Sequence, residues 1–136
     1  MRKHILVAQE EGMGCGLACV ASALGITYQE ARKLSNRIEG SYINGYNCKN
    51  LVNILNKKGK NYIYKKFKPE HTSLLNNFGT IVFIKEGKDD LWGHYLLKTS
   101  RGWMDSWINW PLINPAKPGY QKAISGNVMW IIYEKD

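Results

Sequence analysis

This sequence lacks long apolar runs, and their absence argues against a protein with transmembrane helices. No stretch reaches the roughly 18 consecutive apolar residues that a membrane-spanning helix needs, so we expect no transmembrane segment. The amino terminus is basic and then apolar, but its apolar run covers only Ile5 to Ala8, which is too short for a signal peptide. We therefore expect a cytoplasmic protein.

Cysteine is also scarce, since the chain has only Cys15, Cys19 and Cys48. An odd number of cysteines without a secretion signal argues against a framework of disulfides. The spacing of Cys15 and Cys19 lacks the close pairing that is typical of structural zinc sites. We therefore expect no metal and no other cofactor, and we expect Cys19 and Cys48 to pack in the interior.

Acidic residues are outnumbered, with 11 Asp and Glu against 19 Lys and Arg and a net charge of +8. Part of this excess is a cluster of six lysines: Lys57, Lys58, Lys60, Lys65, Lys66 and Lys68. A solvated basic face explains such a cluster most simply, while attraction to an acidic partner is the functional interpretation. No nucleic-acid motif accompanies the lysines, so nucleic acid is not an expected partner. The nearby aromatic residues alternate as a half-buried strand requires.

The pattern along the chain changes from helical to extended. At 136 residues the chain is long enough for one domain, which we assign to 1–136. Thr27 and Glu30 match a capping box, and Asn47 can cap the next helix. Helices are predicted over 16–24, 28–36, 48–58 and 69–77, with strands over 61–67, 80–85, 94–99, 102–108 and 128–133, and with loops over 37–46, 87–90 and 109–126. Helices that precede antiparallel strands predict an α+β fold.

Cys15 lies between a glycine-rich turn and the first apolar helix. A thiol at a helix start faces backbone N–H groups that have no partner within the helix, and it also faces the positive end of the helix dipole. This environment favours the thiolate, which is the nucleophilic form of cysteine. Cys15 is therefore a candidate nucleophile, with a small core residue as the simpler alternative.

A cysteine nucleophile needs a proton acceptor, and three histidines are available. His4 lies in the amino-terminal arm and His71 in a polar stretch that opens a short helix, and both are expected at the surface. His94 follows Gly93 and opens an apolar strand, where functional side chains are frequent.

Asp105 lies 11 residues after His94, in the next predicted strand. An even-length loop between these strands would place the two side chains on one face. Asp105 also stands between Trp103 and Trp107, where a carboxylate without a partner would be costly. His94 is therefore a candidate partner for it, although an arginine or a lysine would serve equally well.

The remaining candidates would serve the substrate. The amide of Gln9 could point at the oxygen of a tetrahedral intermediate, beside the backbone N–H of Cys15. Trp92, Trp107 and Trp110 are candidates for the walls of a substrate groove, with ordinary packing as the alternative.

Taken in order, Gln9, the stretch Cys15 to Cys19, the stretch Gly93 to Tyr95 and Asp105 resemble the bacteriocin-processing, double-glycine C39 peptidases. Members of that family are bacterial, papain-like cysteine peptidases, usually attached to peptide-exporting ABC transporters. The resemblance implies a papain-like α+β fold in which amino-terminal helices pack on a carboxy-terminal antiparallel sheet. It also implies Cys15 as nucleophile, His94 as base, Asp105 as the residue that orients His94, and Gln9 in the oxyanion hole.

The expected activity is therefore hydrolysis of peptide bonds by a peptidase that stands alone, without the transporter. The expected partners are a peptide or protein substrate, such as a leader peptide, and a separate peptide exporter. The same residues could instead transfer the acyl group to amines or deamidate glutamine. Gly14 stands where the family usually has an acidic residue, which keeps open a third reading, a peptide-binding module without catalysis.

Overall fold

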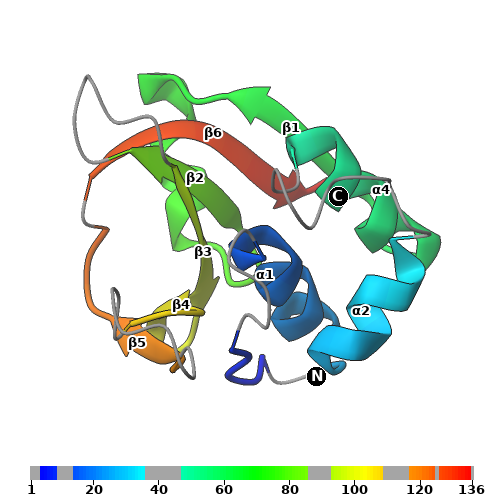
Figure 1. Ribbon diagram of the computed structural model, residues 1–136. Coiled ribbons are helices and arrows are strands. Elements are labelled where there is room, and N and C mark those ends of the chain that lie inside the picture. Colours follow the sequence, from blue (N-terminus) through cyan, green and yellow to red (C-terminus); the bar gives the residue numbers. More distant parts are fainter. Residues whose placement is uncertain are drawn as a thin grey trace.

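In the part of the chain that the structure describes, helices pack on an antiparallel sheet (Figure 1). This computed structural model describes residues 4–8, 14–35, 47–85, 93–108, 117–124 and 126–135. The helices are α1 (Cys15–Leu24), α2 (Tyr28–Leu34), α4 (Cys48–Lys57) and the 3-10 helix η1 (Pro69–Asn76). The strands are β1 (Tyr62–Lys66), β2 (Ile81–Lys85), β3 (His94–Thr99), β4 (Gly102–Asp105), β5 (Gly119–Gln121) and β6 (Asn127–Glu134). The predicted α+β class is confirmed.

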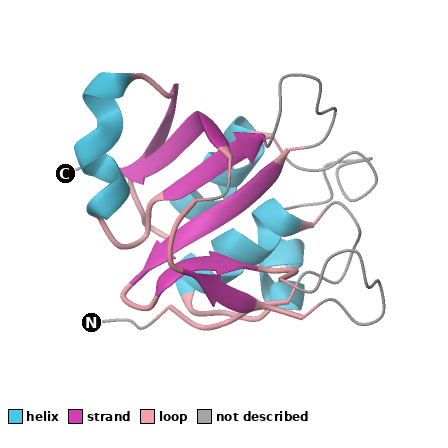
Figure 2. Ribbon diagram, turned by 90° about the vertical axis from the view of Figure 1, so that its left-hand side faces the viewer, coloured by secondary structure: helices cyan, strands magenta, loops and turns pink. Residues whose placement is uncertain are grey.

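The sheet has six strands in the order β1-β6-β2-β3-β4-β5, and they run side by side through the middle of the molecule (Figure 2). Every neighbouring pair is antiparallel. The last strand, β6, is therefore placed between β1 and β2, while β3, β4 and β5 follow one another to the edge of the sheet. In this order β3 is one of the two central strands and β4 is its neighbour. His94 of β3 and Asp105 of β4 are therefore carried by adjacent strands.

The helix boundaries follow from local capping. The side chain of Thr27 accepts a hydrogen bond from the Glu30 backbone N–H, and the Thr27 backbone N–H donates one to the Glu30 carboxylate. Asn47 and Asn50 make the same reciprocal pair at the start of α4. Gly25 ends α1 in the left-handed conformation, with φ of 70°, which glycine adopts without strain.

Two predictions at the carboxy-terminal end need correction. The span 109–126 is not loop throughout, because β5 lies within it and pairs with β4. The strand predicted over 102–108 ends at Asp105, because the backbone N–H of Trp107 is turned back onto the Asp105 side chain. The loop predicted over 37–46 and the turn predicted over 87–90 lie outside the described residues.

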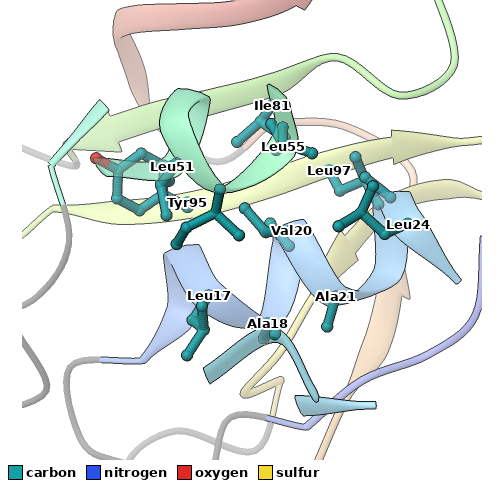
Figure 3. Close-up of a cluster of buried hydrophobic side chains, with 14 of the residues drawn as sticks. Leu17, Ala18, Val20, Ala21, Leu24, Leu51, Leu55, Ile81, Tyr95 and Leu97 are labelled. Carbon is teal, nitrogen blue, oxygen red and sulfur yellow. The ribbon is translucent and has the colours of Figure 1, made fainter. Parts of the chain in front are cut away.

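The main core lies between the helices and one face of the sheet. Helix α1 is buried along almost its whole length and packs against β3, α2 and α4. Large apolar side chains of the sheet and of α4 share this core with α1, seen in Figure 3 as Leu51, Leu55, Ile81, Tyr95 and Leu97. A smaller cluster covers the opposite face of the sheet, where Leu74 and Leu75 of η1 pack on Val82, Leu96 and Ile131.

A matched pair of leucines tests this assignment of the core. Leu55 of α4 is fully buried, whereas Leu6 is 44% exposed. Because truncation of a buried leucine removes burial and leaves a cavity, Leu55→Ala should lower the free energy of unfolding by about 2–5 kcal/mol. Leu6→Ala should lower it by much less. Urea unfolding followed by circular dichroism measures both, and equal losses would contradict the packing described here.

Candidate functional site

Cys15 is the first residue of α1 and is partly exposed. Gly14 precedes it at the N-cap and has no side chain to occupy the free N–H groups of the first turn. The first turn also carries no acidic residue that would offset the positive end of the helix dipole. The position therefore suits a thiolate, or an anion that forms beside it.

His94 and Asp105 come together because β3 and β4 form a tight hairpin. The two strands are joined by only Ser100 and Arg101, an even-length connection. The register pairs Leu97 with Met104, so that Asp105 falls one step further along and diagonal to His94. The Nε2 atom of His94 lies 2.6 Å from Oδ1 of Asp105.

The Asp105 carboxylate is buried, with 6% of the residue exposed, and both of its oxygens are hydrogen-bonded. Besides His94, Oδ1 accepts the backbone N–H of Trp107 at 2.9 Å. Oδ2 accepts Nε2 of Gln121 at 2.7 Å. Burial alone would raise the pKa of Asp105, but these donors and the charge of His94 outweigh it and lower the pKa below its usual value.

The pKa of His94 depends on both Asp105 and Cys15. Burial lowers the pKa of His94, but hydrogen bonds with Asp105 and with Cys15, together with the charges of both side chains, raise it to about 10. Since Nε2 faces Asp105, Nδ1 is the ring nitrogen left for Cys15. The raised pKa favours the protonated imidazole, which stands between the Cys15 side chain and the Asp105 carboxylate.

Sequence reasoning missed Gln121. It lies in β5, opposite Trp103 of β4, inside a span that was predicted as loop. A strand of three residues carries too little periodicity to be recognised from sequence. Only its pairing with β4 brings the Gln121 amide to Asp105.

The other predicted site residues are placed as follows. The backbone of Trp107 holds Asp105, and its side chain is partly buried. Gln9, Trp92 and Trp110 lie outside the described residues, so their roles stay predictions.

The two remaining histidines take no part in this cluster. His4 is half-buried near Gly79, where burial and the charge of Lys60 lower its pKa, so the prediction that it is a surface residue needs correction. His71 is also half-buried rather than fully exposed, and its Nδ1 accepts the backbone N–H of Lys68 at the start of η1.

The remaining cysteines are buried, as predicted. Cys19 is fully buried and Cys48 is 8% exposed, and burial raises the pKa of each. Within the described ranges, no group of three or more His, Cys, Asp or Glu side chains is placed to hold a metal ion. The helices found in these ranges also lack the length and apolar composition needed to cross a bilayer.

The contribution of Gln121 can be tested without a substrate. The amide of Gln121 helps to lower the pKa of Asp105 below its unfolded value of 3.8. Asp105 therefore stabilises the folded state above pH 3.8, and this stabilisation is lost as the pH falls through the lower pKa of the folded state. Gln121→Leu should bring the folded pKa closer to 3.8, so that acid unfolding begins at a higher pH. Circular dichroism during an acid titration measures the midpoint. Gln29→Leu, on the exposed side of α2, is the matched control; the same midpoint in both variants would contradict the role of Gln121.

Comparisons with known proteins find a similarity in structure and no match by sequence. No known protein family and no curated protein sequence matches the chain. Among solved structures, it is similar to the peptidase domain of Streptococcus ComA, a bifunctional ABC transporter involved in a quorum-sensing pathway. The TM-score is 0.56 at 16% sequence identity, and the match covers 96% of this chain and 97% of that one. The chain therefore has a fold similar to that of a peptidase domain over nearly its whole length.

Proposed function

We propose that this protein is a papain-like cysteine peptidase in which Cys15 is the nucleophile, His94 the general base and acid, and Asp105 the residue that orients His94. The observation that carries the proposal is the placement of His94 between Cys15 and Asp105, beside the first turn of a helix. The similarity in fold to a peptidase domain supports the same reaction class. The order of residues along the sequence, which resembles the C39 peptidases, supports it independently.

The reaction would proceed in two steps. The Cys15 sulfur forms a bond to the carbonyl carbon of the peptide, and protonated His94 gives its proton to the amine that leaves. Water then attacks the resulting thioester, His94 takes a proton from it, and the released Cys15 thiolate completes the cycle. In both steps Asp105 holds the orientation of the imidazole through its Nε2 atom, and it stabilises the imidazolium form.

The negative oxygen of the tetrahedral intermediate needs donors. The backbone N–H of Cys15 lies in the first turn of α1, where N–H groups have no acceptor within the helix. We assign the second donor to Gln9, as the sequence predicts. One such donor contributes about 3 kcal/mol in related sites.

The substrate class we propose is a peptide or a protein, with leader peptides as the first candidates and a peptide exporter as a partner. Trp92, Trp107 and Trp110 are assigned to the substrate groove on sequence grounds, and a cytoplasmic location stays a prediction. Acyl transfer to an amine and deamidation use the same thioester, so the identity of the product decides between them.

The reactivity of Cys15 is the first test. At mildly acidic pH, iodoacetamide should alkylate Cys15 on the order of 100-fold faster than Cys19 or Cys48, because an ordinary thiol is almost fully protonated there. Both of those cysteines are buried, and burial raises the pKa of each. Peptide mass spectrometry over time measures the rates. Equally slow reaction of all three would favour a peptide-binding module.

Turnover can be tested on a peptide mixture prepared from a bacterial proteome. The wild-type chain should release new peptide termini, and Cys15→Ala should release none while keeping its thermal unfolding midpoint. Mass spectrometry separates backbone cleavage from deamidation and from amine transfer, because only cleavage shortens the peptide. Cleavage that persists in Cys15→Ala would exclude Cys15 as the nucleophile.

The pH dependence of His94 gives a further test. Its pKa is raised from 6.5 to about 10, so it adds stability fully below pH 6.5, and this stability is lost as the pH rises through about 10. Removing the charge with Asp105→Asn should bring the titration of the ring back toward 6.5. The difference in free energy of unfolding between the wild-type chain and Asp105→Asn should also shrink as the pH rises. NMR titration of the imidazole measures the pKa, and an unchanged value in Asp105→Asn would contradict the pairing.

A further inference from the structure

The two reactive side chains each have a glycine as a direct neighbour, and both glycines lie against aromatic rings. Gly16 follows Cys15, and Gly93 precedes His94. A Cβ atom added at Gly16 would lie 3.0 Å from Cδ2 of Tyr95, while one added at Gly93 would lie 1.8 Å from Cζ of Phe83. Neither position has room for a side chain, so the rings rest directly on the backbone beside Cys15 and beside His94.

The two rings also rest on each other. Phe83 of β2 is directly opposite Tyr95 of β3, so both side chains point to the same face of the sheet. Their ring centroids are 4.8 Å apart with the planes tilted by 54°, a favourable aromatic arrangement. The backbone at Gly16, the Tyr95 ring, the Phe83 ring and the backbone at Gly93 are therefore in continuous contact.

Tyr95 is held on its other sides as well. Only 5% of it is exposed, and its hydroxyl lies 3.7 Å from the sulfur of Cys48, at the start of α4. Leu51 of α4 packs against the same point of α1, since its Cδ1 lies 2.9 Å from the Cβ position at Gly16 (Figure 3). The ring therefore cannot slide along the sheet without disturbing α4.

We propose that Phe83 and Tyr95 are positioning residues that set the separation between Cys15 and His94. This inference rests on the proposed function. The start of α1 can approach β3 only as far as the Tyr95 ring allows, and the backbone before His94 is limited by the Phe83 ring. Since protein interiors are close-packed and yield little, the two rings fix this spacing. A displacement of about 1 Å between reacting groups is enough to reduce a rate by about 100-fold.

The test compares variants that keep or remove the rings, using the rate of Cys15 alkylation by iodoacetamide across the pH range. Phe83→Leu and Tyr95→Leu keep apolar character but remove the aromatic spacers. Each should lower the rate at mildly acidic pH by about tenfold or more, because a displaced His94 no longer favours the reactive thiolate form of Cys15. Tyr95→Phe removes only the hydroxyl and keeps the ring, so it should retain most of the alkylation rate that Tyr95→Leu loses.

A purely structural role would give a different result. Leu55→Ala also damages the main core, but it should lower the thermal unfolding midpoint and leave the pH profile unchanged. If the two leucine variants behave in the same way as Leu55→Ala, the positioning role is wrong while the peptidase proposal stands. If Cys15 of the wild-type chain already reacts as an ordinary thiol, the proposed function itself fails. Should Tyr95→Leu not fold, Phe83→Leu decides alone, because Phe83 is only half-buried.

Discussion

The burial of the Asp105 carboxylate is the constraint on which the site depends. A charged group removed from water is destabilising unless donors surround it, and here His94, the Trp107 backbone and Gln121 supply them. Each donor comes from a different part of the β3–β4–β5 arrangement. The hairpin between β3 and β4 must therefore be tight, β4 must end at Asp105, and β5 must pair beside it. The strand pairings that build this edge of the sheet therefore also bring the donors to Asp105.

The helix that carries Cys15 imposes a second requirement. Its first turn has to face the site, although the rest of α1 is buried between the sheet and the other helices. Small residues such as Gly16, Ala18 and Ala21 allow that close packing, while large side chains of α4 and β3 fill the remaining space. In the proposed peptidase, the positive end of the helix and the imidazolium of His94 would both stabilise a negative charge on the Cys15 sulfur.

Much of this could be predicted from the sequence because it depends on local signals. The capping residues Thr27 and Asn47 mark helix starts, and the even connection after β3 brings His94 and Asp105 together. The contacts of Gln121 with Asp105 and of Phe83 with Gly93 could not be predicted, since they join residues that are not neighbours in the chain. The end of the predicted strand over 102–108 was wrong for a similar reason: a side chain of the site captures the backbone N–H that would have continued it.

The low identity to the ComA peptidase domain, 16% over nearly the whole chain, means that most side chains differ while the fold persists. In this chain the site geometry comes mainly from backbone features, namely a helix start, a two-residue hairpin and two glycines against aromatic rings. Such features constrain few positions, but they constrain them severely, because a single methyl group at Gly93 would meet the Phe83 ring. In this chain these few backbone contacts, together with the hydrogen bonds to Asp105, are what bring Cys15, His94 and Asp105 to one place.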